Sequence, residues 1–147
     1  MGTIWTDIHC ALGLSQFAKL DRFVSRRRQL IERYRRLLAP LAPVVRMPST
    51  PTDGGAAWHL CLVLVDFAAA DTTRARVMNA LKAQGIGSQV HYIPVHRQPY
   101  YEERYGAMTL PGADAYYRRC LSLPLFPAMS DADVDRVVTA LSQVLGR

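Results

Sequence analysis

A long stretch of helical periodicity near the N-terminus sets the first limit on the fold. Its apolar side chains recur at intervals built from steps of three or four residues: Ile8, Leu12, Leu20, Val24, Ile31, Tyr34 and Leu38. This spacing predicts one amphipathic helix over Asp7–Leu38, with Thr6 as its N-cap and Pro40 and Pro43 ending it. Such a helix buries one face, so the rest of the chain must provide a surface against which it packs.

Strand and helix signals alternate in the middle of the chain. Residues 39–57 are rich in Pro and Gly, which indicates a surface connection. The apolar run Trp58–Phe67 predicts a buried strand, and Thr72–Gln84 predicts a helix capped by Asp71 and followed by Gly85 at C′. A second strand is expected at Ser88–His91. The order strand, helix, strand is typical of α/β proteins.

The C-terminal third of the chain adds shorter elements. A helical turn is expected at Glu102–Tyr105 and a short helix at Ala113–Cys120. Leu121–Pro127 contains Pro124, which cannot donate a ladder hydrogen bond, so an edge strand or an extended segment is expected there. Ser130 is predicted to cap a last helix, Asp131–Leu145. The fold class is therefore α/β (α+β): one domain over residues 1–147, with a long N-terminal helix and a small antiparallel or mixed sheet flanked by helices.

Composition excludes several classes of protein. Of the 147 residues, half are hydrophobic and a fifth are charged, and no apolar run is long enough to cross a membrane, so a cytoplasmic globular protein is expected. The net charge of +6 raises the possibility of nucleic-acid binding, because seven arginines lie between residues 22 and 36. Aromatic residues do not interleave with them, which favours a solvated helix face or a subunit contact. No nucleic-acid partner is predicted beyond weak, nonspecific association.

The segment from residue 91 to residue 101 is the strongest candidate for a functional site. It contains two histidines, three tyrosines, an arginine and two prolines: His91, Tyr92, Pro94, His96, Arg97, Pro99, Tyr100 and Tyr101. The prolines should keep the segment stiff, extended at Ile93 and Gln98, and non-helical. Tyrosine faces can stack on a base or a sugar, and histidines can hydrogen-bond its oxygens. The residues alone leave two hypotheses open: a binding surface, or tyrosines that close the edge of a small sheet.

Other chemistry is poorly supported by the sequence. His91 and His96 are five residues apart, which does not align two ligands on one strand or one helical face, and no Cys, Asp or Glu nearby completes a metal site. Cys10, Cys61 and Cys120 are widely separated, and the last two lie in apolar runs that make a thiol unreactive. His59 is interpreted as a structural histidine. A P-loop, a hydrolase elbow and a dinucleotide fingerprint are absent.

Several motifs, in order along nearly the whole chain, resemble one enzyme family. They are Thr6–Gln16 with Lys19–Asp21 and Arg26–Arg28, Trp58–Leu60, Gly85–Gly87, Gln89–His96, Gln98–Tyr101 and Leu121–Pro127. Together they are similar to the C-terminal part of the DegT-type sugar-nucleotide aminotransferases. The central segment is most similar to the enzymes that aminate a UDP-linked 4-keto-6-deoxy sugar on the way to pseudaminic acid.

This resemblance implies the small domain of a fold-type-I transaminase that uses pyridoxal phosphate (PLP) and glutamate and works as a homodimer. In such enzymes the large domain comes first and supplies the Schiff-base lysine. The lysines here, Lys19 and Lys82, have the pattern of solvated helix faces. Gly2 stands where the family has an asparagine that reaches the partner subunit's cofactor phosphate. The expectation is therefore no catalytic, cofactor-binding or metal-binding residue in this chain, and no transaminase activity or cofactor for the chain alone.

The resemblance also implies substrate contacts. Because the family's central loop lies at the mouth of the active site, His91, Tyr92 and His96 are expected to contact the sugar nucleotide, with Tyr100 and Tyr101 as further candidates. Their role would be to position the sugar and not to transfer protons. The alternative is a non-catalytic module that dimerises through the first helix and binds a nucleotide sugar or a separate large-domain chain. In either case an apolar face without its large domain predicts a homo-oligomer, most simply a dimer.

Overall fold

The computed structural model describes residues 6–49 and 56–147. Predictions that concern Gly2, Pro51, Gly54 and Gly55 lie outside these residues. In chain order the elements are helices α1 (Asp7–Phe17) and α2 (Leu20–Leu38), the 3-10 helix η1 (Ala39–Leu41), strands β1 (Val45–Arg46) and β2 (Cys61–Val65), helix α3 (Arg74–Ala83), the 3-10 helix η2 (Val95–Arg97), helices α4 (Pro99–Tyr105) and α5 (Pro111–Arg119), strand β3 (Cys120–Leu123) and helix α6 (Asp131–Val144).

The sheet is small and antiparallel, with β2 between β1 and β3. Cys61 of β2 lies opposite Leu123 of β3, and Val65 lies opposite Val45 of β1. Along β2 the buried residues alternate with half-buried ones, so the strand has one face in the core. The predicted α+β class with a small sheet is confirmed. The strand is shorter than the apolar run Trp58–Phe67 that predicted it, and β1 lies where only a connection was expected.

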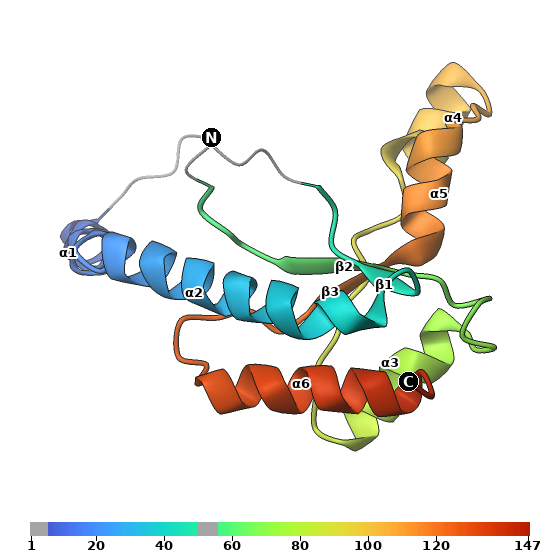
Figure 1. The fold of residues 1–147 in the computed structure, drawn as a ribbon. Helices are drawn as coiled ribbons and strands as arrows, with labels where there is room; N and C mark the ends of the chain where they lie inside the picture. Colours follow the sequence, from blue (N-terminus) through green and yellow to red (C-terminus); the bar gives the residue numbers. More distant parts are fainter. Residues whose placement is uncertain (1–5, 50–55) are drawn as a thin grey trace.

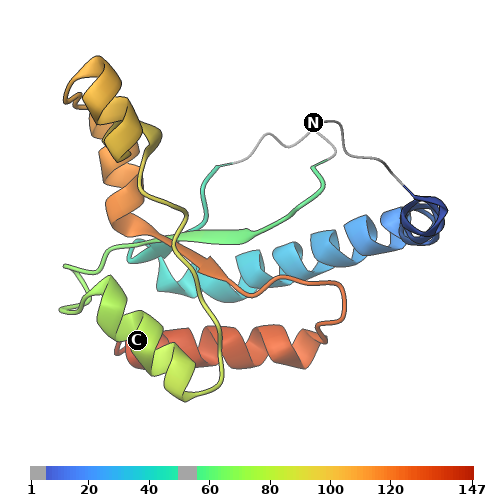
Figure 2. The same ribbon diagram turned by 180° about the vertical axis from the view of Figure 1, so that it is seen from behind.

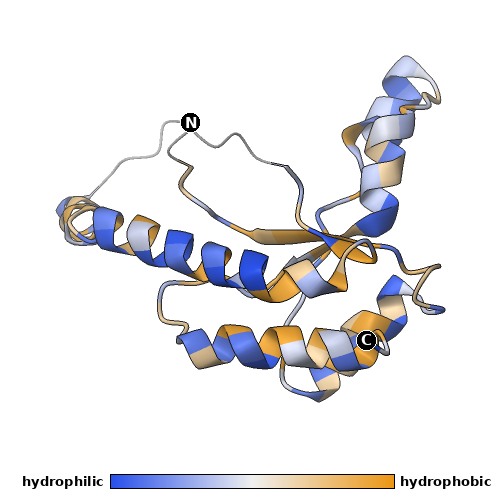
Figure 3. Ribbon diagram, viewed as in Figure 1, coloured by the Kyte–Doolittle hydropathy of each residue, from blue (hydrophilic) through white to orange (hydrophobic). Residues whose placement is uncertain are grey.

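The core lies between this sheet and a layer of helices. Helices α2 and α6 run side by side, and α3 packs beside α6 (Figures 1 and 2). Apolar side chains from the buried faces of these elements meet in one cluster, which includes Leu30, Ile31, Tyr34, Leu38, Val63, Val65, Val77, Leu81, Val134 and Leu141. The strands and the inward faces of the helices are accordingly the most hydrophobic parts of the ribbon, while the outer face of α2 is hydrophilic (Figure 3).

Local side-chain chemistry explains where the helices begin. Ser130 caps α6 reciprocally: its hydroxyl accepts from Asp133 N at 3.1 Å, while the Asp133 carboxylate accepts from Ser130 N at 2.7 Å. Thr6 caps α1 in the same way with His9, so both predicted caps are confirmed. The prediction that Asp71 caps the third helix is wrong. The N-cap is Thr73, and Asp71 lies in the turn before it with a positive φ of 47°.

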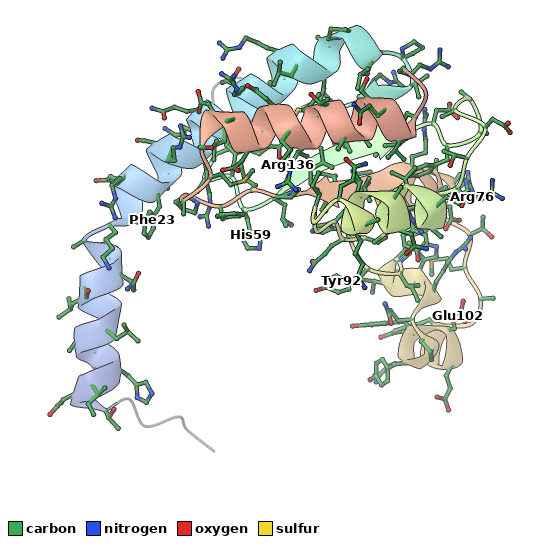
Figure 4. The ribbon with its side chains drawn as sticks, turned by 90° about the horizontal axis from the view of Figure 1, so that it is seen from below. Phe23, His59, Arg76, Tyr92, Glu102 and Arg136 are labelled. Carbon is green, nitrogen blue, oxygen red and sulfur yellow. The ribbon has the colours of Figure 1, made fainter. Side chains whose placement is uncertain are left out.

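The predicted helix over Asp7–Leu38 is present as two helices that meet at an angle (Figure 4). The helical hydrogen bonds are interrupted at Ala18 and Lys19, where Lys19 N donates to Gln16 O across three residues at 3.0 Å. Helix α2 buries residues against α6 and the sheet, whereas α1 buries none. The sequence periodicity continues through the break, and only tertiary packing distinguishes the two halves.

Arginines of α2 hold the helical layer together. Arg33 forms an ion pair with Asp135, and Arg26 donates to Met129 O and to Asp131, so two basic residues of α2 bind the N-terminal end of α6. A further guanidinium, that of Arg35, lies over the Trp58 ring with 5.3 Å to its centroid. These contacts are within one chain, so Arg26, Arg33 and Arg35 are not merely solvated, as the arginine-rich stretch had suggested.

The segment from α4 to α5 projects from the compact part of the molecule as an arm (Figure 1). At its base, Arg74 of α3 donates to the carbonyl of Tyr117 near the end of α5, and its guanidinium lies 4.7 Å from the centroid of the Tyr117 ring. The strand predicted at Ser88–His91 is reduced to a single antiparallel bridge, Gln89 with Ser122. No helix of the described residues is long and apolar enough to cross a membrane.

Candidate functional site

A cleft of about 700 Å³ lies between the segment 91–97 and the arm. One wall comes from the loop before η2, and the other comes from α4, α5 and the turn that joins them. Its lining is mainly aromatic and aliphatic, with Tyr105, Met108, Leu110, Tyr116 and Tyr117 on the arm. A concave, mostly apolar surface with a few polar groups is the usual form of a small-molecule site.

Two prolines shape the loop wall of the cleft. Pro94 precedes the 3-10 helix η2, and Pro99 occupies the first position of α4, where its missing N–H is not needed. Between them Gln98 is extended, with φ −76° and ψ 135°, as predicted for a residue before proline. Its side-chain amide donates to Ile93 O at 2.9 Å and closes the turn. The prediction that the prolines keep this segment free of helix is wrong, because Pro99 begins one.

The structure brings four of the five predicted site residues to the cleft. His91, Tyr92, His96 and Tyr101 line it, whereas Tyr100 does not. The Tyr100 phenol instead accepts a hydrogen bond from Arg104 at 2.8 Å, and its ring meets the Tyr101 ring edge-on. Figure 4 shows Tyr92 projecting from the chain beside the arm that carries Glu102. These positions support a shared role for the four residues, which remains a prediction.

Each histidine of the cleft has a polar neighbour from another element. His91 Nδ1 lies 2.7 Å from the hydroxyl of Ser122 on β3. His96 Nε2 lies 3.4 Å from Oδ1 of Asp114 on α5, and Arg97 Nε lies 2.8 Å from the same oxygen. His96 and Asp114 are both buried, whereas the Arg97 side chain is 48% exposed, so solvent partly screens its ion pair with Asp114. The two contacts attach the loop to β3 and to the arm.

Burial also affects one phenol of the arm, that of Tyr116. Partial burial, with a smaller contribution from Cys120, raises the pKa of Tyr116, so its hydroxyl stays protonated and able to donate at neutral pH. The Cys120 thiol donates weakly to Tyr117 O at 3.4 Å. The cleft therefore presents aromatic faces, phenol hydroxyls and imidazole nitrogens, which suit a ligand with a ring and several oxygens.

Sequence reasoning missed several residues of this site. Ser122 interrupts the apolar alternation between Leu121 and Leu123, and a polar residue within a buried strand was the available signal. Asp114 gave a weaker signal, a lone carboxylate in the first turn of a helix. The contribution of Tyr116 and Tyr117 could not be inferred, because it depends on how the arm folds back toward the loop. Among the described residues, no group of three or more His, Cys, Asp or Glu side chains could hold a metal ion.

Comparison with solved structures gives consistent matches over nearly the whole chain. The PLP form of Spr1654 from Streptococcus pneumoniae, a protein assigned as a sugar aminotransferase, matches 96% of this chain with a TM-score of 0.83 and 27% identity. DesI in the presence of its TDP-sugar product matches 95% with a TM-score of 0.83 and 28% identity. PseC from Helicobacter pylori, an aminotransferase involved in pseudaminic acid biosynthesis, matches 99% with a TM-score of 0.85 but 21% identity, a likeness of fold alone.

These relatives are much longer than this chain. The aligned part covers 36% of the Spr1654 chain, 35% of DesI and 40% of PseC. The chain thus spans between about a third and two fifths of the length of the structures it matches. Residues 3–142 match the sequence pattern of a family of sugar aminotransferases, which agrees with the motifs in the cleft loop and in β3. The chain belongs to the DegT/DnrJ/EryC1/StrS aminotransferase family.

Proposed function

We propose that this chain is the substrate-facing small domain of a PLP-dependent sugar-nucleotide aminotransferase, and that the cleft between the loop and the arm holds the nucleoside-diphosphate sugar. The observation that carries the proposal is the convergence of His91, Tyr92, His96 and Tyr101 on one cleft of about 700 Å³. A volume in the range of several hundred cubic ångströms suits a ligand of this size. Family membership supports the same class of ligand.

The groups in the cleft have distinct parts in this proposal. The tyrosine rings offer faces on which a base or a sugar ring stacks. The imidazoles and phenols offer a small number of hydrogen bonds to hydroxyl or phosphate oxygens, which fix the orientation of the ligand. Their function is positioning: they hold the sugar so that its keto carbon meets an amine that another part of the enzyme supplies.

The lysines of this chain do not fit a covalent PLP site. Lys19 lies at the junction of α1 and α2, Lys82 is exposed on α3, and neither lines the cleft. A Schiff-base lysine must face the cofactor in a pocket that lowers its pKa. We therefore propose that the lysine comes from a large domain outside these residues, and that the chain alone has no transaminase activity. The test is to add PLP and look for an absorption band of lysine-bound PLP that borohydride fixes onto a lysine; finding that band on Lys19 or Lys82 would refute the proposal.

We further propose that the ligand is a UDP-linked 4-keto-6-deoxy sugar. The proposal is supported by the form of the loop around Tyr92 and Pro94, which resembles the pseudaminic-acid-pathway enzymes. DesI, with its TDP-sugar product, gives a competing choice of nucleotide. A uracil and a thymine differ by one methyl group, so aromatic stacking alone discriminates weakly and the sugar must contribute to selection.

A binding experiment tests the cleft. Isotope-labelled chain is titrated with UDP-N-acetylglucosamine and, separately, with TDP-glucose, and the imidazole signals of His91 and His96 are followed by NMR. We expect both to shift saturably while the exposed His59 does not. Tyr101→Ala should weaken binding by roughly 10-fold through loss of a stacking face. Tyr100→Phe, which lies outside the cleft and keeps the ring contact with Tyr101, should change it by less than about twofold. Absence of saturation, or equal effects of the two variants, would refute the proposed site.

We also propose that α1 is covered by a second copy of the chain. Ile8, Leu12, Leu14 and Phe17 of α1 are all exposed, and they lie on different sides of the helix. A helix that is apolar all round is stable in water only when other chains or domains surround it. This favours a homo-oligomer over a monomer. A large-domain chain that covered α1 instead would leave the isolated polypeptide monomeric.

A further inference from the structure

Ser122 is the polar residue of an otherwise apolar strand. It lies in β3 between Leu121 and Leu123, it is 4% exposed, and all four residues of the strand are buried. Its hydroxyl is 2.7 Å from Nδ1 of His91, thirty-one positions earlier in the chain. A buried hydroxyl is kept where its hydrogen bond has a role in structure or function, because a small apolar residue would otherwise fit the strand better.

The backbone around this contact is fixed. Ser122 N donates to Gln89 O at 2.8 Å, and Gln89 N donates to Ser122 O at 3.1 Å. Residues two apart on an extended chain point to the same side, so His91 is the diagonal neighbour of Ser122 across this bridge. The Cys120 thiol adds a weak contact to His91 O at 3.8 Å. Ser122 is therefore placed by β3 itself, at a constant position relative to the histidine.

The direction of the hydrogen bond follows from the burial of the hydroxyl. A serine hydroxyl has one proton, and among the described residues the acceptor recorded for it is His91 Nδ1. If the imidazole donated instead, the serine proton would have no acceptor recorded among the described side chains and backbone, which is the more costly arrangement for a largely buried residue. The hydroxyl accordingly donates and Nδ1 accepts. In the neutral ring the proton then resides on Nε2, since the hydrogen bond at one nitrogen sets the state of the other.

We propose that Ser122 is a positioning residue for ligand recognition: it holds the His91 ring in one orientation and one tautomer, so that Nε2–H is offered to the cleft as a donor. The partner that suits a fixed donor is an oxygen acceptor of the ligand, a diphosphate or hydroxyl oxygen. The ligand part of this statement rests on the proposed function, because it takes the sugar nucleotide as the occupant. The orientation and tautomer of His91 do not depend on any ligand.

The orientation and tautomer of His91, which do not depend on a ligand, are tested first. Chain labelled with nitrogen-15 in histidine contains four imidazoles, those of His9, His59, His91 and His96, each assigned by substitution. At a mildly alkaline pH, we expect the neutral form of His91 to show an unprotonated Nδ1 that accepts a hydrogen bond and a protonated Nε2. Ser122→Ala should move the Nδ1 resonance toward that of a nitrogen without a hydrogen bond, and leave His59 and His96 unchanged.

Ser122→Thr keeps the hydroxyl and should restore the native Nδ1 resonance. A protonated Nδ1 in the native chain, or an Nδ1 resonance that Ser122→Ala does not move, would overturn the proposal. Loss of the other imidazole resonances would indicate a folding defect in the alanine variant, and the decision then rests on the native spectrum and on Ser122→Thr.

The second stage uses UDP-N-acetylglucosamine. Ser122→Ala should weaken its binding about 3- to 10-fold, as expected for a lost orienting hydrogen bond, while Ser122→Thr binds within about twofold of the native chain. Equal binding by the alanine variant and the native chain would overturn the role in recognition. If the native chain shows the expected tautomer but binds no nucleotide sugar, the proposed function fails while the assignment of Ser122 as the residue that orients His91 stands.

Discussion

Arg33 of α2 and Asp135 of α6 form a two-point ion pair, in which Nε lies 2.6 Å from Oδ1 and Nη2 lies 2.6 Å from Oδ2. The parallel geometry of guanidinium and carboxylate is the strongest form of such a pair. It connects two helices that are about a hundred residues apart in sequence. Together with the ion pairs of Asp131 with Arg26 and Arg33, it makes part of the contact between α2 and α6 dependent on the charge of carboxylates.

Acid should therefore loosen this helix pair. The hydrogen bonds from Arg33 hold the pKa of Asp135 below its ordinary value of 3.8. A carboxyl with a lower pKa in the folded state stabilises the fold at pH values above its unfolded pKa, and this stabilisation is lost as the pH falls through the folded pKa. We expect the free energy of unfolding, measured with urea, to fall as the pH drops below 3.8, and to fall less steeply in Asp135→Asn. A slope in Asp135→Asn equal to that of the native chain would contradict the role of this ion pair.

Tyr34 provides a second test within the core. Its side chain is fully buried, and its phenol donates to Pro124 O at 2.9 Å, which ties α2 to the segment after β3. Tyr34→Phe removes the donor and leaves the carbonyl of half-buried Pro124 without this hydrogen bond, so the free energy of unfolding should fall by about 1 kcal/mol. Tyr105→Phe on the exposed part of α4 should change it by less than about 0.5 kcal/mol. Identical urea midpoints for the native chain and Tyr34→Phe would contradict the role of this hydrogen bond.

The cysteines should differ in reactivity. Burial raises the pKa of the Cys61 thiol from 9.0 to about 12, so very little thiolate exists there at neutral pH. Cys10 is exposed on α1, whereas Cys61 and Cys120 are buried. We expect iodoacetamide to label Cys10 in the dilute native chain, and Cys61 only after unfolding, as read by peptide mass spectrometry. Alkylation of Cys61 and Cys10 at similar rates under native conditions would contradict this expectation.

Self-association through α1 is tested by Phe17→Ser. This side chain is 72% exposed, and α1 contributes no buried residue, so the substitution should leave the urea midpoint of the dilute chain unchanged. If a second copy covers α1, the same substitution should shift the assembly toward monomer in sedimentation velocity. Arg36→Ser, on the hydrophilic face of α2, serves as the control. A native chain that sediments as a clean monomer at high concentration would exclude the proposed contact.

Local chemistry allowed part of the fold to be predicted. The caps Thr6 and Ser130 were identified because a capping side chain binds backbone within three residues of itself. Gly85 was assigned to the end of α3 for a similarly local reason, and it has the expected positive φ of 73°. The prediction that Asp71 is an N-cap was wrong because Thr73, two residues later, also has a side chain that can cap the helix. Capping propensity alone does not decide which of two neighbouring residues becomes the N-cap when the side chain of each can cap a helix.

Features that depend on contacts between distant residues could not be predicted from local sequence in the same way. Gln89 pairs with Ser122 of β3 through a single bridge. The sequence at Ser88–His91 indicated a strand, but it did not show that the pairing would be limited to one residue. The break at Lys19 arises because α2 packs on α6 and α1 packs on nothing within the described chain. In the cleft, the loop residues were predicted from their density in sequence, but Asp114 and Tyr116 join them only through the fold of the arm. Long-range contacts set these positions.

The residues that line the cleft and the residues that form the hydrophobic core are separate sets, with no member in common among those described. Natural variation can therefore act on the two sets independently. Under the proposed function, replacement of a cleft-lining side chain between residues 92 and 110 should change ligand preference without opening a cavity under the sheet. On the same proposal, relatives that share this scaffold can diverge in the sugar they bind while retaining the same hydrophobic core, and directed evolution of new sugar specificity should begin with the arm.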